Sequence, residues 1–155
     1  MSAHVEVQFA LQDPALPPAS AFRIWARAAL ADHPSEVELT VRVADESESR
    51  QLNREFRGKD RPTNVLSFPF EMPEGMPAAE AGHHLGDLLI CAPVVEREAS
   101  EQRKTPAAHW AHMVVHGVLH LRGFDHEDQA DAQRMEDKER EVLDGLGFSD
   151  PYALA

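Results

Sequence analysis

Residues 116–126 read His116-Gly117-Val118-Leu119-His120-Leu121-Arg122-Gly123-Phe124-Asp125-His126, and their three histidines decide how the chain has to fold. His116 and His120 are four residues apart. On a helix they therefore project from one face, separated by about 6 Å along the axis and about 40° in rotation. Two imidazoles in this arrangement can bind one metal ion at about 2.0–2.1 Å each.

His126 can bind the same ion only if the helix ends before it. In an uninterrupted helix, His126 would lie about 9 Å beyond His120 and about 240° further round the axis. Gly123 is the expected end, because glycine readily adopts the left-handed conformation that terminates helices. We therefore predict that His116, His120 and His126 bind one metal ion. Three protein ligands leave a fourth position for water, which is typical of a catalytic metal site.

The spacing also permits a different pair on the same helix, formed by His112 and His116. We prefer His116 and His120 as the pair, because Gly123 supplies the turn that returns His126 to them. The other histidines near these motifs are expected to be packed or solvated side chains: His83, His84, His109 and His112.

The spacing of the three histidines is also that of the metzincin metalloproteases, in which a glutamate after the first histidine is the general base. This chain has Gly117 at that position. The sequence thus predicts a metzincin-like three-histidine metal site but argues against peptide hydrolysis by the metzincin route.

The composition is that of a globular protein. With 155 residues and a mass of 17.3 kDa, the chain is expected to form a single domain over residues 1–155. The single cysteine, Cys91, excludes a disulfide framework. We expect no signal peptide and no membrane span, because the N-terminus lacks a basic start and no apolar run approaches about 18 residues. These features favour a cytoplasmic protein.

The charge is unevenly distributed along the sequence. The net charge of −12 argues against a protein that coats nucleic acid generally. Five basic residues nevertheless fall between positions 50 and 61, against two acidic ones. A local basic patch can bind phosphate even on an acidic chain, because salt screens the more distant charges. The basic residues are Arg50, Arg54, Arg57, Lys59 and Arg61.

The apolar patterns predict four strands and five helices. The strands are expected at 4–10, 36–44, 64–70 and 85–91. The helices are expected from Ser20 to about Asp32, from Asp45 to about Arg57, from Pro93 to about Lys104, from Pro106 to Gly123, and from about Asp128 to Leu146. Residues 71–83 are expected to form a mobile loop, and residues 151–155 a loosely attached tail. Ile24, Leu52, Phe56, Phe68 and Phe124 are expected in the core.

Residues 116–126 resemble the signature H-G-x-L-H-L-x-G-[YF]-D-H of the YbeY endoribonuclease family, the bacterial rRNA maturation factors. Three other segments also resemble that family, and the likeness runs in order from about residue 37 to 152. They are Leu52-Asn53 with Phe56-Arg57-Gly58-Lys59-Asp60, then Pro62-Thr63-Asn64-Val65-Leu66-Ser67-Phe68-Pro69, and Leu85-Gly86-Asp87-Leu88-Leu89-Ile90. One departure is Asn64, where the family pattern usually has aspartate.

The resemblance implies an α+β fold with a small four-stranded mixed sheet and about five helices. It implies a Zn²⁺ ion, or Ni²⁺ or another divalent transition metal, held by His116, His120 and His126. It also implies single-strand-specific RNA cleavage in 16S rRNA 3′-end maturation and ribosome quality control. The expected partners are then rRNA, the small ribosomal subunit and its assembly factors.

The same resemblance makes Arg57 the essential arginine, which we group with His116 as a catalytic residue. Arg54, Arg57, Lys59 and Arg61 are the expected RNA contacts. The chemistry agrees, because cleavage of a phosphodiester develops negative charge that a Lewis acid and a guanidinium can stabilise. Two other hypotheses of function remain: a metalloprotease-like or other metallohydrolase, and a ribosome-assembly binding factor with a structural metal.

Overall fold

The computed structural model describes residues 3–71, 75 and 83–153. Within these ranges the elements follow one another as β1 (Ala3–Phe9), α1 (Ala19–Ala28), β2 (Val37–Ala44), α2 (Glu46–Arg57), β3 (Val65–Pro69), β4 (His84–Cys91), α4 (Ala92–Glu101), α5 (Pro106–Leu121) and α6 (Gln129–Gly145). Most of the loop expected at 71–83 lies outside the described residues.

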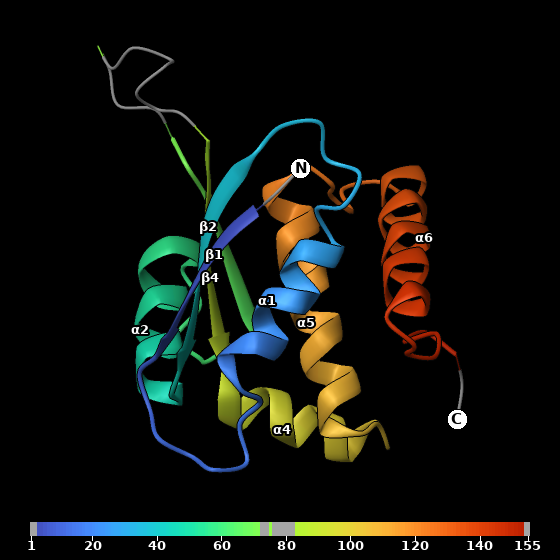
Figure 1. Ribbon diagram of the computed structural model, residues 1–155. Coiled ribbons are helices and arrows are strands. Elements are labelled where there is room, and N and C mark those ends of the chain that lie inside the picture. Colours follow the sequence, from blue (N-terminus) through green and yellow to red (C-terminus); the bar gives the residue numbers. More distant parts are fainter. Residues whose placement is uncertain (1–2, 72–74, 76–82, 154–155) are drawn as a thin grey trace.

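The four strands form one mixed sheet in the order β1-β2-β4-β3. β2 pairs in parallel with β1 and β4, whereas the edge strand β3 pairs antiparallel with β4. Helices α1 and α5 cover one face of the sheet, with α6 on the outside of α5, and α2 lies on the opposite face (Figure 1). The expected α+β fold, with a four-stranded mixed sheet and about five helices, is confirmed within the described residues.

Helix α5 is the centre of the core. Its residues from His109 to Val115 are all buried, and it contacts α1, α4, α6, β3 and β4. A helix buried on every side presents almost no polar surface to water, so its few polar side chains need partners inside the protein. This requirement shapes the histidine site described below.

The sequence patterns misplaced some residues. Helix α1 begins after Pro18, without a side-chain cap from Ser20, and ends at Ala28 rather than near Asp32. Ile24 is 56% exposed, because α1 buries Phe22, Trp25 and Ala26 on its opposite side. Phe56 is 64% exposed.

Helix α2 buries only part of the apolar face expected of it, because Leu52 is partly buried whereas Phe56 is exposed. Its buried residues are Ser49 and Asn53, which bond to the segment that runs back along the helix. The Ser49 hydroxyl donates to the carbonyl of Thr63 at 3.0 Å, and Asn53 Nδ2 donates to the carbonyl of Arg61 at 2.8 Å. Polar contacts with residues 61–63 therefore accompany a small apolar contact, in which the partly buried Leu52 packs against Leu66 and Leu89.

The predicted helix end at Gly123 is confirmed. Helix α5 ends at Leu121, and Gly123 adopts the left-handed conformation with φ of 97°. The Gly123 amide donates to the carbonyl of His120, and the Phe124 amide donates to that of Leu119, both at 3.0 Å. This pair of bonds is a Schellman motif, which reverses the chain direction and carries it towards His126.

Gly117 lies where α5 approaches the sheet most closely. A Cβ atom at this position would lie 2.8 Å from Leu88 Cδ2 and 3.2 Å from Val65 Cγ2. A side chain at position 117 would therefore be directed into β3 and β4. A glutamate there could not serve as the base that metzincin proteases carry at this place.

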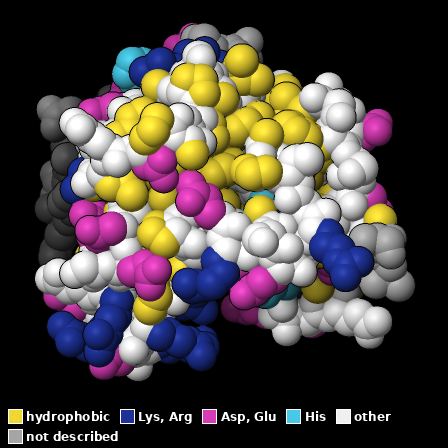
Figure 2. All heavy atoms as spheres, turned by 90° about the horizontal axis from the view of Figure 1, so that it is seen from below, with side chains coloured by type: hydrophobic (Ala, Val, Ile, Leu, Met, Phe, Trp, Pro, Cys, Tyr) yellow, Lys and Arg dark blue, Asp and Glu magenta, His cyan; other side chains and the backbone are white. Residues whose placement is uncertain are grey.

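The surface shows the uneven charge distribution. Seen from below, hydrophobic side chains form a patch in the upper half of the view, while Lys and Arg side chains gather at the lower left (Figure 2). No helix in the described ranges is both long enough and apolar enough to span a membrane.

We predict that Gly117→Ala lowers the free energy of unfolding by about 1–3 kcal/mol, because the added methyl group overpacks a site against Leu88. Equilibrium urea denaturation measures this change. Gly145→Ala is the control, since position 145 is also helical and has nothing within 4 Å of an added Cβ. It should leave stability unchanged or raise it by up to about 1 kcal/mol. Equal stability of the two variants would contradict the close approach of α5 to the sheet.

Candidate active site

The C-terminal end of α5 and the turn after it bring three histidines together. The ring centroids are 4.6 Å apart for His116 and His120, 5.2 Å for His120 and His126, and 6.0 Å for His116 and His126. One nitrogen from each ring lies within 4.8 Å of the other two. Small side-chain rotations would let all three bind one ion at about 2.0–2.1 Å, so the donor set fits a zinc-like metal.

The three histidines differ in exposure. His116 and His120 are partly buried, whereas His126 is exposed. Burial lowers the pKa of His120, and the neighbouring His116 and His126 lower it further. A lowered pKa keeps the imidazole neutral near pH 7, which is the form that binds metal. The site is thus open to solvent on the side of His126.

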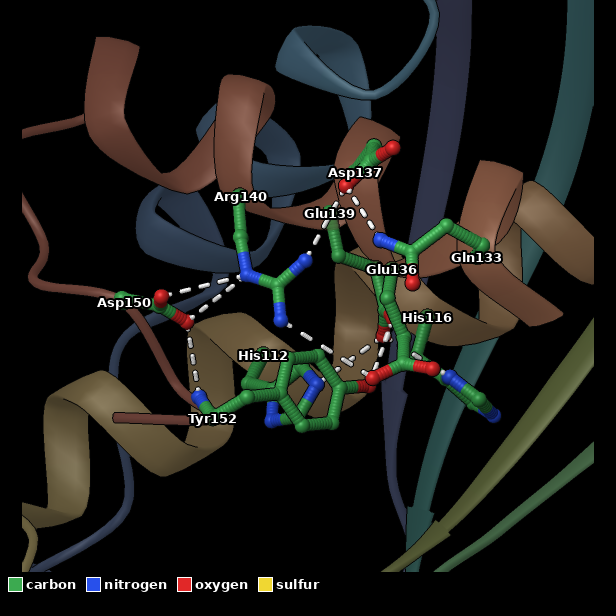
Figure 3. Close-up of polar contacts among 9 residues, drawn as sticks. All are labelled: His112, His116, Gln133, Glu136, Asp137, Glu139, Arg140, Asp150 and Tyr152. Atoms are coloured by element: carbon green, nitrogen blue, oxygen red, sulfur yellow. Dashed lines mark hydrogen bonds and ion pairs between the residues drawn. The ribbon is translucent and has the colours of Figure 1, made fainter. Parts of the chain in front are cut away.

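A buried carboxylate is hydrogen-bonded to His116. Glu139 of α6 is fully buried, and its Oε1 accepts hydrogen bonds from His116 Nδ1 and His112 Nε2, both at 2.9 Å (Figure 3). Its Oε2 accepts a hydrogen bond from the Tyr152 hydroxyl at 2.6 Å. Burial by itself would raise the pKa of Glu139, but these three hydrogen bonds outweigh it and lower the pKa to about 2. Glu139 is therefore ionised at neutral pH.

The contact with Glu139 determines which nitrogen of His116 can bind a metal. Because Nδ1 donates to the carboxylate, the lone pair of Nε2 is left for the ion. A carboxylate behind a ligand histidine fixes the ring orientation and makes the imidazole a better ligand.

The structure also bears on the alternative pairing of His112 with His116. His112, His116 and Glu139 form a second set of groups whose ligand atoms lie within 4.8 Å of one another. In this set, hydrogen bonds of 2.9 Å already join both histidines to the carboxylate, and His112 and Glu139 are buried. His112 is thus a packed side chain that supports Glu139. His109 is packed as well, 2.9 Å from a carboxylate oxygen of Glu98.

The segment after α6 holds Tyr152 in place. Arg140 Nε donates to both carboxylate oxygens of Asp150 at 3.1 Å, and Asp150 Oδ1 accepts the Tyr152 amide at 2.8 Å. The Arg140 guanidinium also lies over the Tyr152 ring, 5.1 Å from its centroid. The expectation of a loosely attached tail is therefore wrong for residues 151–153, while 154–155 lie outside the described residues.

Sequence reasoning missed Glu139 and Tyr152, although one signal for Glu139 is present. Met135, Glu139 and Leu143 are the buried residues of α6, and they are spaced four apart. A carboxylate within the apolar stripe of an amphipathic helix needs a buried partner, which points to histidines on the neighbouring helix. Tyr152 follows the last helix and carries no comparable periodic signal.

The basic segment reaches the histidines through one residue. Arg57, the last residue of α2, lines a cavity of about 1330 Å³ together with His116, His120 and His126. Arg54 instead lies 3.9 Å from Asp60. Lys59 and Arg61 are exposed on the segment that follows α2, and Arg50 pairs with Asp60 at 2.8 Å.

Strand β3 forms part of the cavity wall and joins it to α5. The Ser67 hydroxyl donates to the carbonyl of Gly117 at 3.3 Å, next to His116 in the chain. Phe68 and Phe124 also line the cavity. Both are partly buried, so they lie at the boundary of the core rather than inside it.

Asn64 has a role that an aspartate could not fill in the same way. Its Nδ2 donates to the two carboxylate oxygens of Glu98 at 3.1 and 3.3 Å, and its Oδ1 accepts the Val65 amide at 2.7 Å. The side chain thus links the start of β3 to α4. An aspartate here would keep the bond to Val65 but would place two carboxylates against each other.

We predict that Glu139→Gln weakens Zn²⁺ binding by about 10- to 100-fold, because His116 loses a charged hydrogen-bond acceptor. Competition with a chromogenic chelator measures the affinity without any substrate. Glu136→Gln is the matched control, since Glu136 lies on the same helix and pairs with Arg140 at 3.9 Å. Zinc affinity as high in Glu139→Gln as in Glu136→Gln would rule out a role for Glu139 in orienting His116.

We also predict that Asn64→Asp lowers the free energy of unfolding at pH 7 by on the order of 1–3 kcal/mol. Two facing carboxylates raise each other's pKa in the folded state, so the folded variant binds more protons than the unfolded one and regains stability as the pH falls. Thermal denaturation at pH 7 and pH 5 tests both points.

The control for this variant is Gln133→Glu, which creates the same chemical change on the exposed face of α6. Gln133 Nε2 donates to Asp137 Oδ1 at 2.8 Å. Solvent screens an exposed pair, so this substitution should cost less than about 0.5 kcal/mol. Equal losses of stability in the two variants would mean that a carboxylate pair at Asn64 and Glu98 is no more costly than a solvent-screened pair on the surface.

The comparison with known proteins agrees with the geometry. The family model described as Endoribonuclease YbeY matches residues 18–147. A protein of Halorhodospira halophila named Endoribonuclease YbeY is 59% identical over 136 residues, covering 88% of this chain and 88% of the relative. Its namesake from Alkalilimnicola ehrlichii is 58% identical over 153 residues, covering 97% and 91% of the two chains.

A solved structure shares the fold as well. The solution structure of TM1509 from Thermotoga maritima has a TM-score of 0.59 and 25% sequence identity, covering 98% of this chain and 99% of that one. The family model and the curated relatives both extend over most of the chain. The chain therefore belongs to the YbeY endoribonuclease family.

Proposed function

We propose that this protein is a metal-dependent endoribonuclease that cleaves single-stranded RNA. The observation that carries the proposal is that Arg57 and the three histidines, from elements far apart in the sequence, line one cavity. A guanidinium and a metal-binding group facing the same space suit a phosphodiester, which gains negative charge as it is cleaved.

The residues have distinct roles in this proposal. Arg57 donates hydrogen bonds to the phosphoryl oxygens and stabilises the charge that develops on them. His116, His120 and His126 hold a divalent metal, which supplies Lewis acidity at the same phosphate when bound. Glu139 keeps the His116 ring in one orientation, and the buried His112 and the hydroxyl of Tyr152 keep Glu139 in place. Arg54, Lys59 and Arg61 attract the RNA backbone from outside the cavity.

Family membership supports a proposal for the biological setting. We propose action in 16S rRNA 3′-end maturation and in ribosome quality control, with the small ribosomal subunit and its assembly factors as partners. A cytoplasmic location and a single catalytic domain over residues 1–155 belong to the same proposal. Zn²⁺ is the proposed metal, and Ni²⁺ or another divalent transition metal would also suit three imidazoles.

The two other hypotheses, a metalloprotease-like hydrolase and a binding factor with a structural metal, have less support. Peptide hydrolysis by the metzincin route needs a carboxylate at position 117, which is directed into the sheet against Leu88. A structural metal normally has four protein ligands closed around it. The three histidines here line a cavity, and His126 is exposed.

We predict that Arg57→Ala lowers the rate of single-stranded RNA cleavage by about 10²- to 10³-fold, the usual effect of removing one group that stabilises transition-state charge. Zinc affinity and thermal stability should stay at wild-type values, because Arg57 is exposed at the end of α2. A gel assay with an end-labelled RNA oligonucleotide measures the rate.

Arg134→Ala is the matched control, because Arg134 is an exposed arginine on α6 that pairs with Asp131. It should cleave RNA at the wild-type rate. Wild-type activity in Arg57→Ala would remove Arg57 from the mechanism, and an inactive metal-loaded wild-type protein would refute the endoribonuclease proposal itself.

A further inference from the structure

Phe56 is a large apolar side chain that is exposed to solvent. It is 64% exposed on the last turn of α2, immediately before Arg57. It is held by an edge-to-face contact with Phe68, with ring centroids 5.2 Å apart and an interplanar angle of 71°. An edge-to-face pair leaves ring surface free, and the high exposure of Phe56 shows that its own ring is not covered.

The aromatic pair belongs to the same cavity as the histidines. Phe56, Phe68 and Arg57 line it together with His116, His120 and His126. Ile24, which is similarly exposed at 56%, does not line this cavity. Isolated exposed apolar residues are ordinary in proteins, so it is the position of Phe56 beside Arg57 that needs an explanation.

The pair and the histidines lie on opposite sides of the edge strand β3. Leu66 and Phe68 belong to a small apolar cluster with Leu52 of α2, whereas the intervening Ser67 bonds to the backbone of α5. The C-terminal ends of α2 and α5 lie at the same end of the molecule, on the two faces of the sheet (Figure 1). A ligand that fills the whole cavity must therefore cross the free edge of β3.

We propose that Phe56, supported by Phe68, is a stacking subsite for one nucleobase of a single-stranded RNA that crosses the edge of β3. The inference rests on the proposed function and adds to it the part of the protein that selects an unpaired strand. Arg57 holds a phosphate beside the subsite, and the combination of a cation with an aromatic platform is typical of single-strand binding.

The subsite explains a preference for single strands in physical terms. A base in a duplex is already stacked on both faces and paired at its edge, so it cannot be placed on the Phe56 ring without breaking those contacts. An unpaired base loses little by moving there. Every base has a π face, so the subsite is expected to tolerate all four bases.

The test measures RNA affinity separately from cleavage. Metal is removed with a chelator, and fluorescence anisotropy gives the Kd of the full-length protein for a labelled single-stranded RNA oligonucleotide. Phe56→Leu, which keeps an apolar side chain but removes the ring, should raise the Kd about 5- to 150-fold, the range for the loss of one base–aromatic stack. Phe56→Trp should restore binding, and Ile24→Ala should bind as the wild type does.

A series of RNA oligonucleotides, each lacking one base, adds a second measure. The wild type should lose affinity at one abasic position by about the same factor as Phe56→Leu loses on intact RNA. Phe56→Leu should lose nothing further at that position, because the stack is already absent. Duplex RNA should bind wild type and Phe56→Leu equally.

The outcomes separate the two proposals. If the wild type binds and cleaves single-stranded RNA while Phe56→Leu matches it in Kd and in rate, the stacking subsite is refuted and the endoribonuclease proposal stands. If the wild type with metal restored neither binds nor cleaves RNA, both are refuted. If Phe56→Leu loses affinity on intact RNA and equally on every abasic oligonucleotide, Phe56 acts without stacking a base and the subsite is refuted.

Discussion

The hydrogen bonds that converge on Glu139 are the constraint on which the rest of the site depends. A fully buried carboxylate carries a large desolvation penalty, which is offset only when its oxygens are paired with good geometry. Its donors come from α5 and from the segment after α6, so the pairing fixes three parts of the chain against one another. The orientation of His116 and part of the packing of α6 on α5, which Met135 and Leu143 also support, therefore depend on one interaction.

The two sides of the cavity are built on different physical principles. The histidine side rests on α5, a helix buried along most of its length, and His116 is held in place by its hydrogen bond to the buried Glu139. The side formed by α2 buries the polar Ser49 and Asn53, which hydrogen-bond to residues 61–63, and leaves Phe56 and Arg57 exposed. Across the edge of β3, a rigid part of the cavity lining that positions chemical groups thus adjoins a part whose side chains have more freedom to adapt to a flexible polymer.

The features that follow from local rules could be predicted from the sequence. Four strands, five helices, the left-handed glycine after α5 and the grouping of His116 with His120 follow from periodicity, capping and helix geometry. The family resemblance supplied the mixed sheet. Contacts between distant segments could not be predicted in this way. Tyr152 reaches Glu139 only after the chain has turned back past α6, and the buried Ser49 and Asn53 of α2 find their partners in residues 61–63, beyond the end of the helix.

The Schellman motif at Gly123 has a consequence for how this segment can vary in length. One inserted residue between His120 and Gly123 would rotate everything beyond it by about 100° and shift it by about 1.5 Å along the axis. The helix could not absorb the change by turning, because Gly117 is locked against Leu88 one turn earlier. The eleven residues from His116 to His126 therefore behave as a cassette of fixed length, in which substitutions are easier to accommodate than insertions or deletions.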